Sequence, residues 1–259
     1  MSHPYRIRPA TKSDADDYVR THIEFTNVTY AHHAPPEFAR NRRADYADRL
    51  IELFADLREA ADAEASGREP HRRHWVALNP LGTIVGVASA GVGIEPWEAL
   101  HLGDAWTPPA TDRVLSHLYL APGTHGSGLA QDMLDAALPG GLPAYLWAFD
   151  ENRRAAGFYR KNGFAPDGLH GLSGAPWGNM PMSRWSRGRF LAGRAWDRPA
   201  TPVEDVPASS RPVAPEAVSP IASTPSRRAF LGGAAAVALV GAGAATTGRW
   251  LRTRFDAAV

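Results

Sequence analysis

A glycine-rich loop between an apolar run and an amphipathic run is the stretch best suited to chemistry. Residues 118–130 read LYLAPGTHGSGLA, with glycines at positions 123, 126 and 128, and QDMLDAAL follows directly. The first turn of a helix leaves backbone N–H groups unpaired, and glycine lets an anion approach them closely. The stretch predicts a phosphate-binding loop with donors from residues 124–129. A tight turn that needs glycine for its backbone angles is the alternative.

The spacing of the glycines excludes two common nucleotide-binding loops. A Walker A loop has a Lys-Ser or Lys-Thr pair after its last glycine, and no such pair follows Gly128. The dinucleotide-binding loop has the spacing G-x-G-x-x-G, whereas this loop has G-x-x-G-x-G. The segments around the loop must therefore identify its chemistry.

The composition of the chain limits its class. The 259 residues are enough for one good core with a small addition. Because 28 Lys and Arg balance 27 Asp and Glu, the chain lacks the strongly basic character of a nucleic-acid-binding domain, and no nucleic-acid partner is expected. The absence of cysteine excludes a disulfide framework, a Cys-based zinc site and a cysteine nucleophile. The N-terminus, MSHPYRIRPATKSDADDY, lacks the apolar region of an ordinary signal peptide.

Strand-like and helix-like runs predict the elements that position the loop. Thr11 or Ser13 is expected to cap the first helix, and Gly163 to end the last one. Strands are predicted at 5–10, 74–79, 83–92, 114–121, 143–149 and 180–185, and helices at 14–30, 43–65, 127–138 and 152–163. This order predicts an α/β or α+β fold in which helices cover one sheet.

A second segment gives the loop a context. Within residues 145–168, a strand-like run is followed by a set of spaced residues: Asn152, Ala155, Phe158, Tyr159, Gly163 and Phe164. This set resembles the N-x-x-A-x-x-F-Y-x-x-x-G-F motif of the GNAT superfamily of N-acetyltransferases. Residues 122–130 resemble the P-x-x-R/Q-G-x-G-x-G/A loop of that family, and IRPATKSDADDY and HWVALNPLGTIVGVASAG are similar to its opening segments. The resemblance covers residues 5 to about 187 and implies a mixed, mostly antiparallel central sheet flanked by helices.

The resemblance implies acetyl-CoA, or a related acyl-CoA, as the acyl donor, and no metal. The pyrophosphate would lie on the amides of the loop, and the pantetheine would pair with the backbone of the preceding strand. Asn152 would contact the pantetheine or cap its own helix. The predicted donor-binding residues are Leu118, Leu120, Thr124, His125, Gly126, Ser127, Gly128, Leu129, Ala130 and Asn152.

His125 is a departure from the family motif, because it stands where the family usually has Arg or Gln. Most phosphate contacts in such a loop come from the backbone, so binding is expected to persist. A neutral imidazole lacks the fixed charge of a guanidinium, which is expected to weaken that binding.

Two proton transfers are implied. A base must take a proton from the acceptor ammonium, and an acid must protonate the leaving thiolate. Tyr159 matches the family's acid, with a core aromatic beside Phe158 as the alternative. For the base, the strand before the loop offers Ser116 and His117, and at most one of them is expected to line the cleft because neighbours on a strand face opposite ways. His117 is either that base or a packed, hydrogen-bonded histidine.

The predicted function is transfer of an acetyl group from acetyl-CoA to a primary amine, on a small molecule or a peptide, by direct attack. Glu24, Tyr30 and His32 are candidates for the acceptor site. A loop at 33–38 and an irregular insertion at 95–112 are candidates to shape or cover it. A non-catalytic acyl-CoA-binding or sensing module is the alternative, since the base is poorly defined.

The composition changes twice after the predicted acetyltransferase domain, residues 1–187. Residues 188–225 are rich in Pro, Ala and Ser and predict a disordered linker. Residues 226–259 begin with SRRAFLGG, similar to a twin-arginine export motif, and residues 229–247 carry no charge. As a helix this uncharged run would span about 28 Å, close to one bilayer core. It predicts an anchor that holds a cytoplasmic catalytic domain at the inner face of the membrane; a twin-arginine-dependent anchor and a non-membrane tail are the alternatives.

Overall fold

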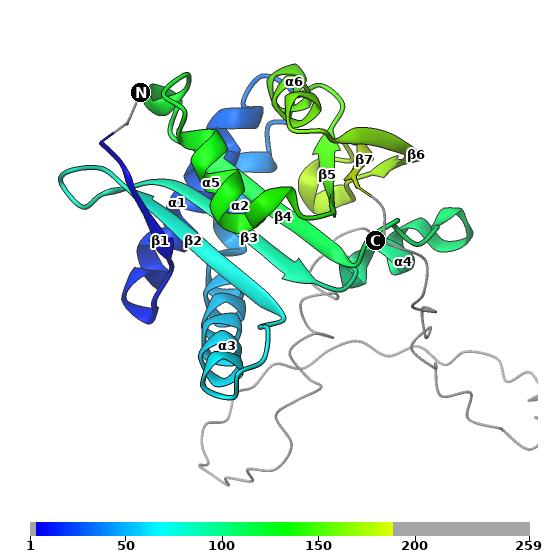
Figure 1. The fold of residues 1–259 in the computed structure, drawn as a ribbon. Helices are drawn as coiled ribbons and strands as arrows, with labels where there is room; N and C mark the ends of the chain where they lie inside the picture. The colour runs from blue at the N-terminus through cyan, green and yellow to red at the C-terminus, as the bar shows by residue number, and fades with distance from the viewer. Residues whose placement is uncertain (1–3, 189–259) are drawn as a thin grey trace, which may run out of the picture. The chain divides into compact units, whose positions relative to one another are not determined.

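The computed structural model describes residues 4–188 (Figure 1). The predicted linker at 188–225, apart from Gly188, and the predicted hydrophobic segment at 226–259 lie outside the described residues. Among the helices of residues 4–188, none has the length and apolar character needed to span a membrane.

Within residues 4–188 the strands form one seven-stranded sheet in the order β1-β2-β3-β4-β5-β7-β6. Neighbouring strands run antiparallel except β4 and β5, which are parallel. The strands are β1 (Arg6–Pro9), β2 (Arg72–Leu78), β3 (Ile84–Val92), β4 (Arg113–Leu120), β5 (Ala144–Phe149), β6 (Ala165–Leu172) and β7 (Pro181–Arg187). The prediction of a mixed, mostly antiparallel sheet is confirmed.

Helices cover both faces of this sheet. In Figure 1, α5 lies in front of the sheet, and α1 and α3 lie behind it. The helices are α1 (Ala15–Tyr30), α2 (Phe38–Ala44), α3 (Tyr46–Ala65), α4 (Pro96–Leu102), α5 (Leu129–Ala137) and α6 (Arg153–Lys161). Successive side chains of a strand point to opposite faces. In β2, Trp75 and Ala77 accordingly pack on the α5 side and Val76 and Leu78 on the side of α1 and α3.

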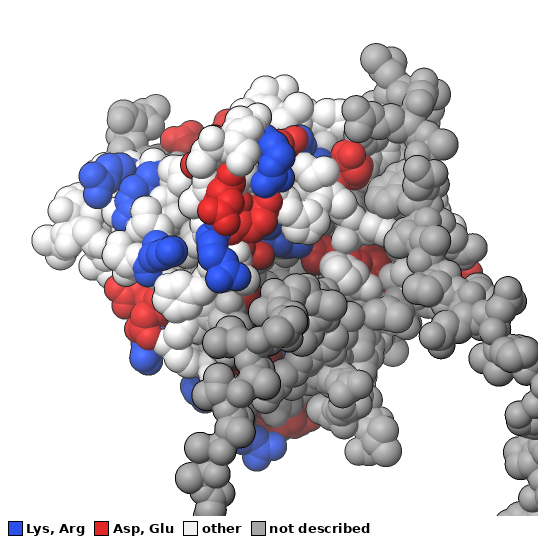
Figure 2. Space-filling view, turned by 90° about the horizontal axis from the view of Figure 1, so that it is seen from below, with Lys and Arg blue, Asp and Glu red and all other residues white. Residues whose placement is uncertain are grey.

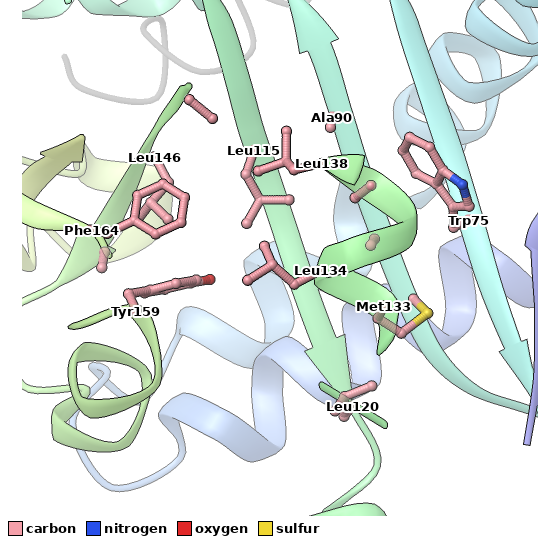
Figure 3. Packing of buried hydrophobic residues seen from close by; sticks show 14 of the residues in the cluster. Trp75, Ala90, Leu115, Leu120, Met133, Leu134, Leu138, Leu146, Tyr159 and Phe164 are labelled. Carbon is pink, nitrogen blue, oxygen red and sulfur yellow. The ribbon is translucent and has the colours of Figure 1, made fainter. Parts of the chain in front are cut away.

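The core on the α5 side holds the glycine loop in place. Met133 and Leu134 of α5 are 0% exposed and pack with Leu115 of β4 and Leu146 of β5 (Figure 3). Full burial of such a side chain contributes roughly 1.5–3 kcal/mol. Packing therefore fixes the start of α5, and with it the loop that leads into the helix.

An opening in the sheet separates β4 from β5. The two strands pair only at Val114 and Tyr145, whereas β4 pairs with β3 from Arg113 to Leu120. One edge of β4 is therefore left without a partner strand beyond Val114. This gap in the ladder is where a second extended chain can pair with β4.

Three segments differ from the predicted elements. The predicted loop at 33–38 leads into α2, and the predicted irregular insertion at 95–112 contains α4, with Pro96 at a first-turn position where its missing N–H costs nothing. Strand β6 was not predicted, because APDGLHGL carries the residues that strands disfavour. It lies at the edge of the sheet, and its pairing with β7 is irregular between Pro166 and His170.

The first helix is entered through a short turn. Thr11 is the N-cap of a 3-10 turn, Lys12–Asp14, which leads into α1. The predicted cap therefore lies one turn before the α-helix itself. The Asp14 carboxylate accepts hydrogen bonds from the Thr11 amide and from both Arg8 Nη groups, each at 2.7 Å. These bonds connect the turn to β1.

Charges of both signs alternate on the described surface. Figure 2 shows one face on which Lys and Arg side chains lie among Asp and Glu. Ion pairs near the surface of the described residues include Arg73 with Glu64 at 2.6 Å and Arg20 with Asp16 at 2.6 Å. Pairs of this kind contribute little to stability.

Candidate active site

Two glycines shape the loop before α5. Gly126 has φ +80°, and Gly128, the N-cap of α5, has φ +94°. A residue with a Cβ adopts such angles only with strain, which explains why glycine stands at both positions. The loop therefore ends in an open first turn, at the positive end of the α5 dipole.

Some amides of the loop serve the loop itself. The N–H groups of Thr124, His125 and Ser127 donate to carbonyls three residues earlier, at 3.0, 3.3 and 3.3 Å. The Leu129 amide donates to Ser127 Oγ at 3.3 Å. These four amides, all predicted as anion donors, are thus engaged in building the turn.

The remaining amides are open to a ligand. The N–H groups of Gly126, Gly128 and Ala130 have no hydrogen-bond partner within the described chain. Of the predicted donors at 124–129, only two amides are therefore open. The third open amide, that of Ala130, lies one residue beyond the predicted range. Three open amides on alternate residues, at and just before a helix N-terminus, suit a phosphate or pyrophosphate group.

Arg154 supplies the cation that the loop motif lacks. Its Nη1 donates to Nδ1 of His125 at 2.9 Å, from the first turn of α6. Burial, and then the Arg154 charge, lower the pKa of His125. A neutral His125 accepts the hydrogen bond and holds the guanidinium beside the loop, so positive charge is present although the motif position is a histidine.

A cleft of about 260 Å³ connects this loop to the exposed edge of β4. It is lined by β4 from Leu115 to Leu120, by the loop, by part of β5 and by α6. The predicted donor-binding residues that line it are Leu118, Leu120, Thr124, His125, Gly126, Gly128, Ala130 and Asn152. Ser127 and Leu129 do not line it; the Leu129 side chain is 0% exposed in the core.

Asn152 caps α6 and also lines the cleft. Its Oδ1 accepts the Ala155 amide at 3.1 Å. The side-chain amide nitrogen is not needed for this cap. Of the two predicted roles, the cap is therefore confirmed, and contact with a bound ligand stays compatible with it.

Tyr159 lies at the boundary between core and cleft. Its ring packs at 5.5 Å from Phe158 and 5.7 Å from Phe164, yet the residue lines the cleft. Figure 3 shows the ring reaching from α6 toward Leu134, with the hydroxyl at its leading end. Burial raises the pKa of Tyr159 above its ordinary value, so the hydroxyl keeps its proton at neutral pH and is able to donate it.

The end of α6 fixes the position of Tyr159. Gly163 has φ +81°, and the Gly163 and Phe164 amides donate to Arg160 and Tyr159 carbonyls, each at 3.0 Å. This is the Schellman arrangement that ends a helix. The predicted glycine cap is confirmed, and it holds the helix turn that carries the tyrosine.

A β-bulge in β4 brings both Ser116 and His117 to the cleft. Ser89 pairs with His117 and Ala90 with Leu115, so Ser116 is an extra residue in β4. Ser116 and His117 both line the cleft. The prediction that at most one of them does so was wrong, because a bulge interrupts the alternation on which it was based.

His117 is hydrogen-bonded and stacked as well as facing the cleft. Its Nε2 lies 2.7 Å from Tyr18 Oη, and its ring stacks on His22 at 4.1 Å between centroids. Burial, with the nearby charges of His74, Arg72 and Arg49, lowers the pKa of His117 well below its usual value. The imidazole is therefore neutral near pH 7 and has the form required of a base.

Ser116 is held by an ion pair behind the cleft. Its Oγ donates to Glu95 Oε1 at 2.6 Å, and Arg72 Nη1 donates to the same carboxylate oxygen at 3.0 Å and to Ser116 Oγ. The hydroxyl proton is thus committed to Glu95. Ser116 consequently forms part of the wall of the cleft and is not poised as a nucleophile.

A second hollow of about 140 Å³ adjoins the cleft. The two share Tyr30, Ser116, Tyr119, Trp147 and Ala148 as lining residues. Three large aromatic side chains from different elements are among its eight remaining lining residues: Trp97, Phe149 and Trp177. The predicted insertion contributes Trp97 and His101, whereas Trp147 and Trp177 were not singled out in the sequence.

Only one of the three predicted acceptor-site residues in or near α1 lies at the site. Tyr30 is buried and lines both hollows, but Glu24 and His32 are exposed and line neither. The face of α1 turned to the sheet carries residues four apart, Tyr18, His22, Thr26 and Tyr30, all buried. This spacing was visible in the sequence and would have pointed to Tyr18 and His22.

Glu98, on α4, is a buried acid beside the second hollow. It is 0% exposed, and burial raises its pKa from 4.5 to about 7. Because the folded chain binds this proton more tightly than the unfolded chain does, the free energy of unfolding falls as the pH rises from 4.5 to 7. The nearest groups are Tyr145, Trp147, Glu95, Trp106 and Arg184.

Replacing Glu98 with glutamine is expected to stabilise the protein at pH 8 relative to wild type, by up to about 3 kcal/mol, and to change little at pH 5. Urea unfolding of both proteins at the two pH values measures the difference. Glu24→Gln, at an exposed position on α1, is the control. An equal effect of Glu98→Gln at both pH values would show that the acid is not protonated on burial.

Residues 70–166 match the model of a family described as acetyltransferase (GNAT) domain. The matched range extends from just before β2 into β6 and includes the glycine loop, the cleft-lining part of β4 and α6. Residues 70–166, less than half of the chain, are therefore similar to a GNAT acetyltransferase domain. On this match the chain is an enzyme of the acyltransferase class, and the match leaves the acceptor open.

Solved acetyltransferase structures are similar to this chain. PaiA N-acetyltransferase from Thermoplasma acidophilum, in complex with coenzyme A, is 18% identical, covers 73% of this chain and 100% of its own, and gives a TM-score of 0.49. A histone acetyltransferase HPA2 and related acetyltransferase from Corynebacterium glutamicum is 22% identical, with 74% and 100% coverage and a TM-score of 0.48. None of the curated proteins matches the sequence.

Proposed function

We propose that this acetyltransferase moves an acetyl group from acetyl-CoA to a primary amine, with direct attack of the amine on the thioester. The observation that carries the proposal is the single cleft beside β4, which joins three open loop amides to a neutral histidine and a protonated tyrosine. An anion site at one end and a base with an acid further along are the parts that this reaction requires.

The donor would be held mainly by backbone. The amides of Gly126, Gly128 and Ala130, with the guanidinium of Arg154, would bind the pyrophosphate. The free edge of β4 would pair with the pantetheine as an added strand would. Leu118, Leu120 and Asn152 would line that part of the cleft.

His117 and Tyr159 would carry the two proton transfers. His117 would take one proton from the acceptor ammonium and become an imidazolium, which leaves a neutral amine to attack the thioester carbonyl. The new C–N bond forms and the C–S bond breaks. Tyr159 would give its hydroxyl proton to the leaving thiolate and regain a proton from solvent. The excess proton of the amide nitrogen and the proton held by His117 would pass to solvent, which restores the enzyme.

The acceptor is proposed to be an amine on an aromatic or apolar body. The second hollow, next to the cleft, has walls of Trp97, Trp147, Trp177 and Phe149. Such walls bury apolar groups, and their ring faces attract an organic cation. A panel of aromatic amines, aliphatic polyamines, amino acids and peptides, with thiol release as the readout, tests this. The highest kcat/KM is expected for aromatic amines, and a preference for polyamines would contradict the assignment.

The location of the protein in the cell is proposed from the sequence alone. Residues 229–247 would anchor the protein at the inner face of the membrane and leave the catalytic domain in the cytoplasm. Deletion of residues 226–259 is expected to move the protein from the membrane fraction to the soluble fraction, with kcat unchanged. A full-length protein already found in the soluble fraction would refute the anchor.

A further inference from the structure

A row of hydrogen-bonded side chains runs from His117 to the surface of α3. His117 Nε2 lies 2.7 Å from Tyr18 Oη, which lies 3.2 Å from His74 Nδ1. His74 Nε2 lies 2.9 Å from Asp56 Oδ2. Tyr18 and His74 are 2% and 6% exposed, whereas the Asp56 side chain is 31% exposed. Four elements, β4, α1, β2 and α3, contribute one residue each.

The acceptors in this row decide which way each hydrogen bond points. An ionised carboxylate only accepts, so His74 donates from Nε2 to Asp56 Oδ2. The other partner of Tyr18 Oη is the Ala88 carbonyl at 2.9 Å, which also only accepts. Tyr18 therefore donates its proton to this carbonyl, and the Tyr18 oxygen is left to accept from His117.

The tautomer of His117 follows from this direction. Its Nε2 carries the hydrogen and donates to Tyr18, so the lone pair lies on Nδ1. Nδ1 has no hydrogen-bond partner within the described chain and is not among its fully buried polar atoms. As His117 lines the cleft, Nδ1 is the ring atom left to meet a ligand.

We propose that Tyr18 is a positioning residue for catalysis: supported by the Ala88 carbonyl and by Asp56 through His74, it holds His117 in the Nε2–H tautomer, whose Nδ1 takes the proton of the acceptor ammonium. The inference rests on the proposed function for the identity of the proton donor. In this step the N–H bond of the ammonium breaks and an N–H bond forms at Nδ1. The positive charge that arises on His117 is then stabilised through the Nε2–H bond to Tyr18.

Stacking keeps the ring in place for this task. The His22 ring lies nearly parallel to the His117 ring, with 20° between the planes. The Tyr119 ring lies 5.3 Å from the His22 ring, tilted by 35°. The stack fixes the plane of the His117 ring, and the bond to Tyr18 fixes its flip, because a 180° flip would replace Nε2 with a carbon at Tyr18. The titratable and charged groups around the row are Tyr18 and His22 from α1, Arg49 and Asp56 from α3, Arg72 and His74 from β2, and Tyr119 from β4.

The tautomer can be measured directly in the wild-type protein. Two-bond proton–nitrogen NMR spectra of protein labelled with nitrogen-15 histidine separate the two neutral tautomers, and a His117→Gln spectrum identifies the His117 signals. The Nε2–H form is expected at pH 7. A dominant Nδ1–H form would overturn the proposal, whether or not any amine is acetylated. A failure to acetylate would by contrast count against the proposed function.

Tyr18→Phe tests the positioning role. Without the hydroxyl, His117 is expected to populate both tautomers, and kcat to fall about 10-fold, while the KM for acetyl-CoA stays unchanged. Tyr46→Phe, which removes a tyrosine hydroxyl on α3 away from the row, is expected to leave both readouts unchanged. If Tyr18→Phe folds poorly, the same measurements are made on Asp56→Asn, at the end of the row on the surface of α3. Asp62→Asn on the same helix is then the control. A mixed tautomer population with unchanged kcat, or an unmixed population in the folded variant, would overturn the positioning role.

Discussion

Replacing Tyr159 with phenylalanine is expected to lower kcat about 100-fold and to leave the KM for acetyl-CoA close to that of wild type. The hydroxyl is the only group removed, and the ring keeps its packing against Phe158 and Phe164. Because Tyr159 is buried and its pKa is raised, the hydroxyl is protonated across the neutral pH range. It can therefore protonate a thiolate throughout that range.

Steady-state kinetics with the best amine of the panel, together with thermal unfolding, measures this effect. Unchanged thermal stability with reduced kcat separates the chemical role of the hydroxyl from its packing. Tyr46→Phe again serves as the control for loss of a tyrosine hydroxyl outside the cleft. If Tyr159→Phe turns over as fast as wild type, Tyr159 is a core aromatic and another group protonates the thiolate.

The second large effect is expected from Arg154→Ala, which should raise the KM for acetyl-CoA about 10-fold with little change in kcat. A hydrogen bond to a charged group is worth about 1.5–3 kcal/mol, and the exposure of Arg154 reduces this value. The guanidinium lies at the anion end of the cleft, bound to His125 at 2.9 Å. Its loss therefore affects the binding of the donor and not the reacting atoms.

Arg153→Ala is the matched control, because Arg153 is the neighbouring exposed arginine on α6 and does not line the cleft. It is expected to leave the KM for acetyl-CoA unchanged. Added salt is expected to raise the KM for acetyl-CoA more in the wild-type enzyme than in the Arg154→Ala variant. Equal effects of the two substitutions would mean that the net charge of α6, and not a specific contact, attracts the donor.

Local sequence patterns were sufficient for much of the fold. Gly128 at the start of α5, Asn152 at the start of α6 and Gly163 at its end each meet a backbone requirement that few residue types satisfy. Their positions therefore located the loop and the two helices. The weak strand β6 was missed because its sequence disfavours a strand, and only pairing with β7 forms it.

The features missed in the site all depend on contacts between distant segments. The bulge at Ser116 is set by the register of β4 against β3, which the sequence of β4 alone does not specify. Arg154 becomes the loop's cation only because α6 begins beside His125. The row from His117 through Tyr18 and His74 likewise joins residues far apart in the sequence.

The ratio of acetylated amine to released thiol, measured in one reaction, tests the central claim most directly. The purified enzyme is incubated with acetyl-CoA and the best amine, and released thiol and acetylated amine are counted by absorbance and by mass. The account predicts one acetyl group on the amine for each thiol released, at a rate that Tyr159→Phe and His117→Gln both reduce. Coenzyme A that binds to the cleft while no amine gains an acetyl group, or thiol release without amine acetylation, would contradict it.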